Sequence, residues 1–321
     1  MAGIRILETA HYVPERIVEN EELTHYMDTS DEWISSRTGI SRRHVVTTEN
    51  TSDVTLKVAQ QLLSQADLDA TKLDFILVAT MSPDYLTPGV AAQVQGALGA
   101  TNAFALDVNA ACAGFVYALS VADKMIAQGQ YGLVIGADVL SKLIDWDDRT
   151  SAVLFGDGAG GFLVKGEPIS AIHATDLATF GVDNQAIRAG KIANKNAFVG
   201  EITPAEPYFA MIGRDVYNFA TRQVPISIVK ALNNSGLTLE DIDKVLLHQA
   251  NGRMVEQIAK KLKQPLDKFP TNITEYGNTS AASIPILADE LIKNQTIKRG
   301  DKLVLTGFGG GLSLGTTIIT Y

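Results

Sequence analysis

The stretch LDFILV at residues 73–78 has a counterpart in IDKVLL at residues 242–247, so the chain contains an internal repeat. Asp74 aligns with Asp243, an offset of 243 − 74 = 169 residues. Both stretches are short, apolar runs bounded by polar residues, a pattern typical of buried strands. The repeat therefore predicts that two halves of the chain share one fold.

The repeat continues downstream with nearly constant spacing. YGLVIG at residues 131–136 corresponds to DKLVLT at residues 301–306, and aligning Leu133 with Leu303 gives 303 − 133 = 170. Each of these runs follows a helical pattern, and helical periods alternate with short apolar runs in both halves. This alternation predicts the α/β class, with mixed sheets and a site at the junction of the two halves.

The repeat divides the chain into three regions. Residues 1–170 are expected to form an N-terminal half, and residues 211–321 a C-terminal half. Residues 171–210 have no counterpart and are rich in Ala, Asn and Gly. We expect this region to be a connecting excursion that serves as a lid or pocket wall.

Composition excludes several classes of protein. Of the 321 residues, 46% are hydrophobic and 20% charged, and the net charge of −9 disfavours binding to nucleic acid or acidic membranes. One cysteine allows no internal disulfide, which fits a cytoplasmic location. The N-terminus lacks the features of a signal peptide. The uncharged stretch at residues 85–106 contains proline, glycine and amide residues that do not suit a membrane span.

The cysteine, Cys112, lies between a strand pattern and a helix pattern. FALDV at residues 104–108 predicts a buried strand, and from Ala113 the apolar spacing is helical. Cys112 is therefore expected at a strand-to-helix turn, where free N–H groups and the helix dipole would stabilise a thiolate. A buried structural cysteine is the alternative.

Three further features could carry chemistry. His248 follows the strand pattern KVLL, at a strand end where α/β proteins place functional groups, although a structural histidine is the alternative. Asn278 precedes a helical pattern and could equally be an N-cap or turn residue. The glycine run at residues 309–311 could aim a backbone N–H at an oxyanion. Phosphate binding is less favoured there, because no Lys-Ser/Thr follows.

Together these motifs resemble the β-ketoacyl-acyl-carrier-protein synthase III family, which initiates bacterial fatty-acid synthesis. The matching motifs are ACAGF at Cys112, HQAN at His248, GNTSAAS at Asn278 and GFGGG at Gly307, and the likeness covers residues 4–321. The resemblance implies a thiolase-like αβαβα fold of two duplicated halves, with mixed five-stranded sheets between helices. It also implies a homodimer.

The family's reaction is a decarboxylative Claisen condensation of an acyl-CoA primer with malonyl-acyl carrier protein. Cys112 matches the acyl-accepting nucleophile, and His248 and Asn278 match the pair that assists decarboxylation. Gly310 matches the second oxyanion donor, beside the Cys112 N–H. Two neutral donors suit a developing enolate, which a carboxylate would repel. The resemblance implies coenzyme A thioester as a substrate, with no tightly bound cofactor and no metal.

Further positions match the family's substrate contacts. Trp33 and Arg149 match the pair that sandwiches the adenine of coenzyme A, and Arg37 matches a phosphate contact. Gly213 and Asn251 match contacts to the pantetheine arm. Without the resemblance, Trp33 would be a surface anchor and the two arginines would be partners in solvated salt bridges.

A basic surface after His248 resembles the family's docking site for the acidic carrier protein. The residues that match it are Gln249, Ala250, Asn251, Gly252, Arg253, Lys260 and Lys261. Arg214 and Arg222 could add to this surface, whereas Asn218 stands where relatives carry a basic residue. A solvated charged helix face is the alternative.

Thr87 bears on the choice of primer, because relatives that prefer acetyl often carry Phe at this position and so close the acyl pocket. The smaller Thr predicts tolerance of longer primers. Two other functions fit the same residues: a specialised relative that primes polyketide or quinolone-type synthesis, and a non-catalytic binding module. The chain lacks the second cysteine of biosynthetic thiolases, and Asn278 replaces the second histidine of elongating synthases.

Overall fold

The computed structural model describes residues 2–321, which form two mixed sheets with the same strand order. The first sheet has the order β1 (Gly3–Tyr12), β7 (Gly158–Glu167), β6 (Tyr131–Asp138), β4 (Phe75–Ala79) and β5 (Phe104–Val108). The second has the order β8 (Ile172–Thr179), β13 (Ser313–Thr320), β12 (Lys302–Gly309) and β11 (Lys244–Leu247). The pair β4–β6 in the first sheet and the corresponding pair β11–β12 in the second are parallel. The pairs β6–β7 and β7–β1, and the corresponding pairs β12–β13 and β13–β8, are antiparallel. This common topology confirms the predicted duplication.

Strand pairing also gives the register of the repeat. Phe75 lies opposite Gly132 in the first sheet, and Lys244 lies opposite Leu303 in the second. The first offset is 244 − 75 = 169, as predicted, and the second is 303 − 132 = 171. The predicted offset of 170 in this strand pair is therefore wrong by one residue. Position n of β6 corresponds to position n + 171 of β12.

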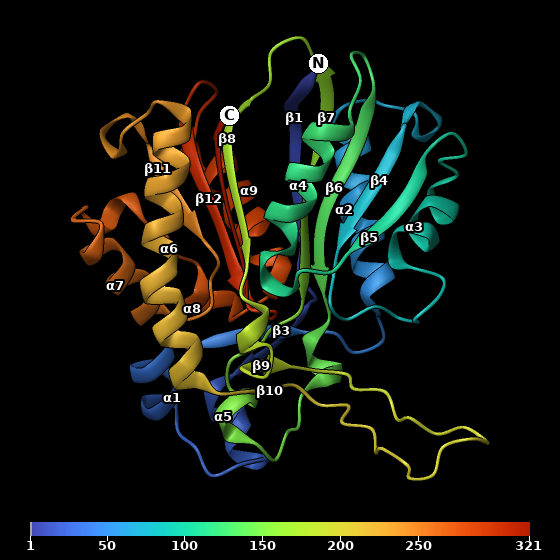
Figure 1. The fold of residues 1–321 in the computed structure, drawn as a ribbon, viewed down its shortest axis with the longest axis vertical. Helices are drawn as coiled ribbons and strands as arrows, with labels where there is room; N and C mark the ends of the chain where they lie inside the picture. The colour runs from blue at the N-terminus through green and yellow to red at the C-terminus, as the bar shows by residue number, and fades with distance from the viewer. Residues whose placement is uncertain (1) are drawn as a thin grey trace.

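The helices and sheets form five layers, α/β/α/β/α, as Figure 1 shows. Helices α2 (Thr51–Gln65) and α3 (Val90–Leu98) cover the outer face of the first sheet, and α6 (Gly213–Ser235) and α7 (Gly252–Lys261) that of the second. Helices α4 (Gly114–Met125) and α9 (Ser283–Lys293) lie between the two sheets and contact both. Within residues 2–321, no helix combines the length and the apolar character that a membrane crossing needs.

The two central helices begin in the same way. Each follows a single 3₁₀ turn, Ala111–Ala113 before α4 and Ser280–Ala282 before α9. The first residue of each turn has a positive φ, 47° at Ala111 and 53° at Ser280, although neither is glycine. These two residues are 280 − 111 = 169 apart. The duplication therefore includes the strained turns that open onto the site.

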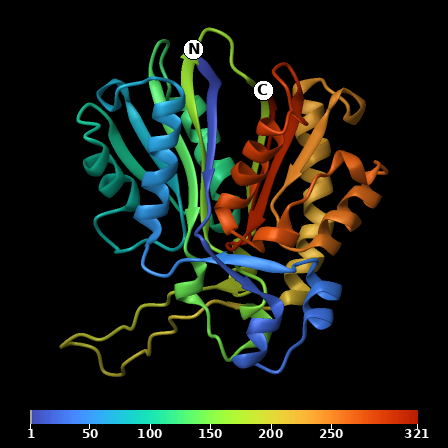
Figure 2. The same cartoon turned by 180° about the vertical axis from the view of Figure 1, so that it is seen from behind.

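Smaller elements close the base of the molecule, below the two sheets in Figures 1 and 2. They are β2 (Arg16–Glu19), α1 (Asp31–Thr38), β3 (Arg42–Val45), α5 (Arg149–Ala152), β9 (Ile187–Arg188), β10 (Ala210–Met211) and α8 (Ile273–Tyr276). Arg43 in β3 is completely buried and donates to Asn20 and to the backbone carbonyl of Val153. This contact fixes the segment that forms one wall of the site.

Two predictions about the second half are wrong. Its sheet has four strands rather than five. By the offset of 169, the segment that would correspond to β5 is residues 273–277, and the short helix α8 occupies it. A helical turn cannot extend the strand ladder, so the second sheet ends at β11.

The predicted excursion at residues 171–210 also begins too early, because β8 is a strand of the second sheet and pairs with β13. Beyond β8, the chain forms a long hairpin arm that projects from the base of the molecule in Figures 1 and 2. Isolated bridges join its two sides, Lys191 to Glu206 and Asn194 to Thr203. Near its tip, the side chain of Phe198 is 97% exposed.

The strand β5 lies at the edge of its sheet and is not buried as predicted. Phe104 and Leu106 are 51% and 49% exposed. Only β4 pairs with this strand, and α3 packs against it. An apolar run with one free edge is a surface suited to pairing with another strand.

Candidate active site

One cavity at the junction of the two halves brings together Cys112, His248 and Asn278. These residues come from three different places in the chain: the turn after β5, the end of β11 and the turn before α9. The cavity has a volume of about 280 Å³ and a mainly apolar lining, to which Phe155 and Phe308 contribute. A largely apolar pocket with a few convergent polar groups is typical of a small-molecule site.

Cys112 lies at the predicted strand-to-helix turn, at the inner end of this cavity, and is 7% exposed. The Ser280 hydroxyl donates a hydrogen bond to the Cys112 Sγ at 3.4 Å. Burial raises the pKa of the Cys112 thiol to about 12, with a smaller contribution from the negative charge of Asp138. Burial thus favours the protonated thiol and outweighs the predicted stabilisation by the helix start.

The glycine run after β12 packs directly against the cysteine. A Cβ on Gly309 would lie 2.9 Å from the Cys112 Cβ and 3.0 Å from its backbone nitrogen, so no side chain fits there. Gly310 follows in the turn and lies beside Ala111 and Ile187. The backbone near Cys112 is thus free of side chains on this side, as an oxyanion site requires. The N–H of Gly310 remains the predicted second donor.

His248 follows the last residue of β11 and is 1% exposed. Helix α7 starts four residues later, at Gly252, so His248 lies in the connection between the strand and the helix. Burial lowers the pKa of His248 to about 3, which keeps the ring neutral at physiological pH. Its Nδ1 lies 2.7 Å from the Ser283 Oγ, and that oxygen accepts the Gln249 N–H at 3.3 Å. If the Ser283 hydroxyl donates to Nδ1, the ring proton lies on Nε2, which is the tautomer that the predicted donor role requires.

Asn278 is held by the opposite wall. Its N–H donates to the Leu154 carbonyl at 2.8 Å, and its carbonyl accepts the Gly156 N–H at 3.1 Å. Its side-chain oxygen accepts the Ser280 N–H at 2.8 Å. The oxygen thus has the turn role that was the alternative prediction, and the amide NH₂ remains as a donor.

Trp33, Arg37 and Arg149 lie together at the mouth of the cavity, where the exposed Arg37 forms part of the lining. The two guanidinium groups lie 4.6 and 5.1 Å from the centre of the Trp33 ring. Trp33 and Arg37 also line the cavity. Arg149 donates to the Asp28 carbonyl at 2.7 Å and forms an ion pair with its carboxylate at 3.6 Å.

Gly213 and Asn251 also line the cavity, at the starts of α6 and α7. The Asn251 side chain caps α7 by accepting the Arg253 N–H at 2.9 Å. It donates to the Arg37 carbonyl at 3.0 Å, which ties α7 to α1. Gly213 and Asn251 thus share one cavity with Cys112, and their contacts to the pantetheine arm stay a prediction.

The predicted carrier-protein surface is only partly accessible. Gln249 is 1% exposed, because its amide donates to the Leu247 carbonyl and accepts the Asn272 N–H. Its assignment to the docking surface is wrong, since its polar groups are satisfied inside the protein. Ala250 and Gly252 are partly exposed, and Ala250 lines the cavity.

The exposed cations of this surface are Arg214, Arg222, Arg253, Lys260 and Lys261. None of them forms an ion pair with an acidic side chain of residues 2–321. Lys261 donates to the Thr221 carbonyl at 2.9 Å, which joins α7 to α6. We call this set the basic rim.

Thr87 is exposed and does not line the cavity of its own chain. It lies in the loop between β4 and α3, where Tyr85 and Leu86 are also exposed. The Asp107 carboxylate in β5 accepts the Val90 N–H at 2.7 Å, so the end of this loop is fixed to the edge strand. The effect of Thr87 on the acyl pocket stays a prediction, and it would require a pocket formed with a second chain.

Sequence reasoning missed Ser280 and Ser283, which contact Cys112 and His248 respectively. Both belong to the motif GNTSAAS, from which only Asn278 was predicted as a site residue. Their spacing of three residues at the start of a helical pattern is a signal for two side chains on one face. It could have indicated that the motif supports the whole triad.

Models of known families match both halves of the chain. Residues 106–181 match 3-oxoacyl-[acyl-carrier-protein] synthase III, and residues 232–321 match the C-terminal part of the same family. The β-ketoacyl-[acyl-carrier-protein] synthase III of Limosilactobacillus reuteri is 53% identical, with 100% of both chains covered.

Solved structures agree. The crystal structure of 3-oxoacyl-[acyl-carrier-protein] synthase III from Aquifex aeolicus has a TM-score of 0.90 and 37% identity, with 100% of both chains covered. The priming β-ketosynthase of the R1128 polyketide pathway has a TM-score of 0.89 and 28% identity, covering 99% of this chain and 96% of its own. The chain belongs to the β-ketoacyl-[acyl-carrier-protein] synthase III family of condensing enzymes, with the thiolase-like fold.

Proposed function

We propose that the protein condenses an acyl-CoA primer with malonyl-acyl carrier protein and so initiates fatty-acid synthesis. The observation that carries this proposal is the shared cavity of Cys112, His248 and Asn278. It contains one buried sulfur nucleophile and two neutral donors, Nε2–H of His248 and the NH₂ of Asn278. The priming polyketide ketosynthase is less similar than the relative from Limosilactobacillus reuteri, 28% against 53% identity.

The first half-reaction transfers the primer. The Cys112 thiol loses its proton, and its sulfur attacks the thioester carbonyl of acyl-CoA. A C–S bond to Cys112 forms and the bond to the sulfur of coenzyme A breaks, so that coenzyme A leaves and takes up a proton. The N–H groups of Cys112 and Gly310 bind the oxyanion of the tetrahedral intermediate.

The second half-reaction builds the carbon–carbon bond. The malonyl unit loses carbon dioxide, and the electron pair of the broken bond moves into an enolate. His248 and Asn278 donate hydrogen bonds to the enolate oxygen, each worth about 3 kcal/mol. The enolate carbon then attacks the acyl-Cys112 carbonyl, and the C–S bond to Cys112 breaks. The product is 3-oxoacyl-acyl carrier protein, and the released Cys112 thiolate takes up a proton to restore the thiol.

The mouth of the cavity suits coenzyme A. An adenine ring can stack on Trp33 once Arg149 moves from its present place over the same ring. Arg37 offers a cation for the phosphates, and Asn251 and Gly213 lie along the route of the pantetheine arm. Coenzyme A thioester enters this scheme as a substrate.

The basic rim suits the carrier protein, whose acidic surface the net charge of −9 would otherwise repel. Arg214 adjoins Gly213, and Arg253 lies two residues after Asn251. Because Gly213 and Asn251 line the cavity, these two cations of the basic rim flank its mouth. One opening would thus receive both thioesters in turn. The carrier protein would dock across α6 and α7.

The edge strand β5 supports a homodimer. Two copies can pair along it, which would cover Phe104 and Leu106 and extend the sheet across both subunits. The loop of Thr87 is fixed to this strand, so pairing would carry it to the other subunit. We therefore propose that Thr87 shapes the acyl pocket of the partner subunit.

Replacing Leu106 by lysine is expected to convert the dimer into a monomer, because a lysine at the pairing edge opposes strand addition. Light scattering after size-exclusion chromatography would measure the mass. Leu177→Lys is the matched control, since Leu177 is 40% exposed on β8, the edge strand of the other sheet. The control should stay dimeric. A dimeric Leu106→Lys protein would contradict pairing through β5.

Condensation with acetyl-, butyryl- and octanoyl-CoA tests the function and the role of Thr87 together. The wild type is expected to form 3-oxoacyl products from acetyl-CoA and from the longer primers. Thr87→Phe should lower kcat/KM for octanoyl-CoA by about 10- to 100-fold relative to acetyl-CoA, since the ring removes space for methylene groups. No product from any primer would refute the proposed function. Strict acetyl preference in the wild type would refute only the role of Thr87.

A further inference from the structure

Asp138 is a completely buried carboxylate at the end of β6 that none of the roles above requires. Its Oδ1 accepts hydrogen bonds from the loop after β4: from the Thr80 hydroxyl at 3.0 Å, the Met81 N–H at 2.9 Å, and the Ser82 N–H and hydroxyl at 3.1 and 2.7 Å. Its Oδ2 accepts the Ala281 N–H at 3.3 Å. The carboxylate thus joins a loop of the N-terminal half to the turn before α9 in the other half.

That turn touches both reacting regions of the site. The Ser280 hydroxyl lies 3.4 Å from the Cys112 Sγ, and the Ser280 N–H donates to the Asn278 side-chain oxygen at 2.8 Å. Burial raises the pKa of Asp138, and the Ser280 hydroxyl is among the donors that oppose this rise. A shift of the turn would therefore move the Asn278 amide and the contact to the thiol together.

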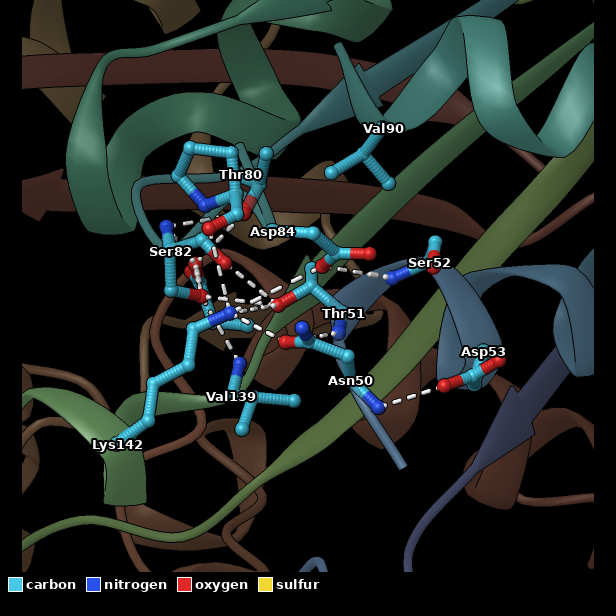
Figure 3. A network of polar contacts seen from close by, with 12 residues as sticks. Asn50, Thr51, Ser52, Asp53, Thr80, Ser82, Asp84, Val90, Val139 and Lys142 are labelled. Atoms are coloured by element: carbon cyan, nitrogen blue, oxygen red, sulfur yellow. Dashed lines mark hydrogen bonds and ion pairs between the residues drawn. The ribbon is translucent and has the colours of Figure 1, made fainter. Parts of the chain in front are cut away.

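The loop after β4, which donates to Asp138, is also held by residues outside the loop, as Figure 3 shows. The Thr51 hydroxyl donates to the Ser82 carbonyl at 2.5 Å, and the Lys142 Nζ lies 3.1 Å from the Thr51 Oγ1 and 3.8 Å from the Asp84 carboxylate. Lys142 also donates to the Asn50 side chain at 2.5 Å. The loop is thus a fixed support on which Asp138 can hold the turn.

The duplication shows what is special about this position. With the offset of 171, Asp138 corresponds to Gly309, and with the offset of 169, Ala281 corresponds to Cys112. In one half a carboxylate binds the N–H of the turn. In the other half a glycine leaves the space beside the Cys112 nitrogen open, where even a Cβ would be 3.0 Å away. One copy of the repeat therefore fills the space with a side chain, while the other keeps it free for a substrate oxygen.

We infer that Asp138 is a positioning residue, which fixes the turn of residues 278–281 so that the Asn278 amide and the Ser280 hydroxyl stay against Cys112. The inference rests on the proposed function, because it assigns this turn to the decarboxylation step. The Asp138 charge raises the pKa of Cys112, so it does not serve to activate the thiol. The other charged groups around the network are Lys142, Asp84 and Asp157.

The variant Asp138→Asn tests the inference with almost no change in shape. Four donors face Oδ1, so the Asn oxygen should occupy that place, and its NH₂ must then face the Ala281 N–H. Two donors cannot bond, and the turn is expected to shift. We expect decarboxylation of malonyl-acyl carrier protein to fall about 100-fold, with acylation of Cys112 within about 5-fold. The pH midpoint of Cys112 alkylation by iodoacetamide should move lower, because a negative charge near the thiol is lost.

Two further variants separate positioning from general destabilisation. Ser82→Ala removes one donor to the same carboxylate and the acceptor of the Val139 N–H, but leaves three donors on Oδ1 and does not touch the turn. We therefore expect a lower free energy of unfolding, with decarboxylation within about 3-fold and an unchanged midpoint. Ser280→Ala keeps the fold, since Ala111 holds the same positive φ in the other turn. It should move the midpoint to higher pH by removing the donor to sulfur, and slow decarboxylation about 3- to 10-fold.

Equal losses of acylation and decarboxylation in Asp138→Asn, or no loss in either, would overturn the inference. If Asp138→Asn yields no folded protein, the Ser280→Ala variant provides the test. An unchanged alkylation midpoint or unchanged decarboxylation in Ser280→Ala would then also overturn the inference. Inactivity of the wild type in both assays would instead refute the proposed function.

Discussion

Replacement of Cys112 by alanine is expected to lower condensation by at least about 10⁴-fold and to abolish the acyl-enzyme. Within residues 2–321, no second cysteine can take the acyl group, and the nearest hydroxyl, that of Ser280, is a much weaker nucleophile. Decarboxylation of malonyl-acyl carrier protein should persist within about 10-fold, because His248 and Asn278 are untouched. Stopped assays for 3-oxoacyl product and for released carbon dioxide measure the two steps.

Cys112→Ser is the matched control for this experiment. It keeps a hydrogen-bonding group of similar size, so it should preserve the turn while still failing to condense. Condensation by the alanine variant within about 10-fold of the wild type would contradict the assignment of Cys112 as the nucleophile. Loss of decarboxylation in the serine variant would show that the two steps are not separate.

Replacement of His248 by alanine is expected to give the opposite pattern. Decarboxylation should fall about 10²- to 10³-fold, the usual effect of removing one preorganised donor from an oxyanion site. Acylation of Cys112 should change by less than about 10-fold, since a neutral His248 is assigned to the enolate and not to the thiol. Radiolabelled carbon dioxide release and a rapid-quench acylation burst would measure both.

The pH dependence provides a control for the state of the ring. Because burial lowers the pKa of His248 to about 3, the ring stays neutral from about pH 5 to pH 8, and wild-type decarboxylation should show no step from it in that range. Ser283→Ala should weaken decarboxylation by a smaller factor, because the preference for Nε2–H is lost. A step near pH 6.5 that disappears in His248→Ala would contradict the donor role.

The duplicated halves could be predicted from the sequence because buried strands repeat their apolar pattern even where their residues differ. Which strands pair with one another in each sheet could not be predicted in this way. FALDV at residues 104–108 reads like a buried strand, yet it lies at an edge, since an apolar edge strand and a central one have the same local pattern. The strand missing from the second half shows the same limit, because residues 273–277, which correspond to β5, form α8 instead.

The triad could be predicted from the family resemblance, but the groups that hold it could not. Gln249 adjoins His248 in the sequence and yet faces inward, because its amide satisfies backbone groups of two separate segments. Asp138 gives no local signal beyond its place at a strand end, and its role depends on a turn that lies 143 residues away in the chain. Thr87 is similar, since its proposed contact requires a second copy of the chain.

The most direct test of the central claim is peptide mass spectrometry of the protein after brief incubation with acetyl-CoA. We predict one acetyl group per chain, on Cys112 alone, which is discharged when malonyl-acyl carrier protein is added. An acetyl group on another residue, or an acetyl-Cys112 that malonyl-acyl carrier protein leaves intact, would contradict the account.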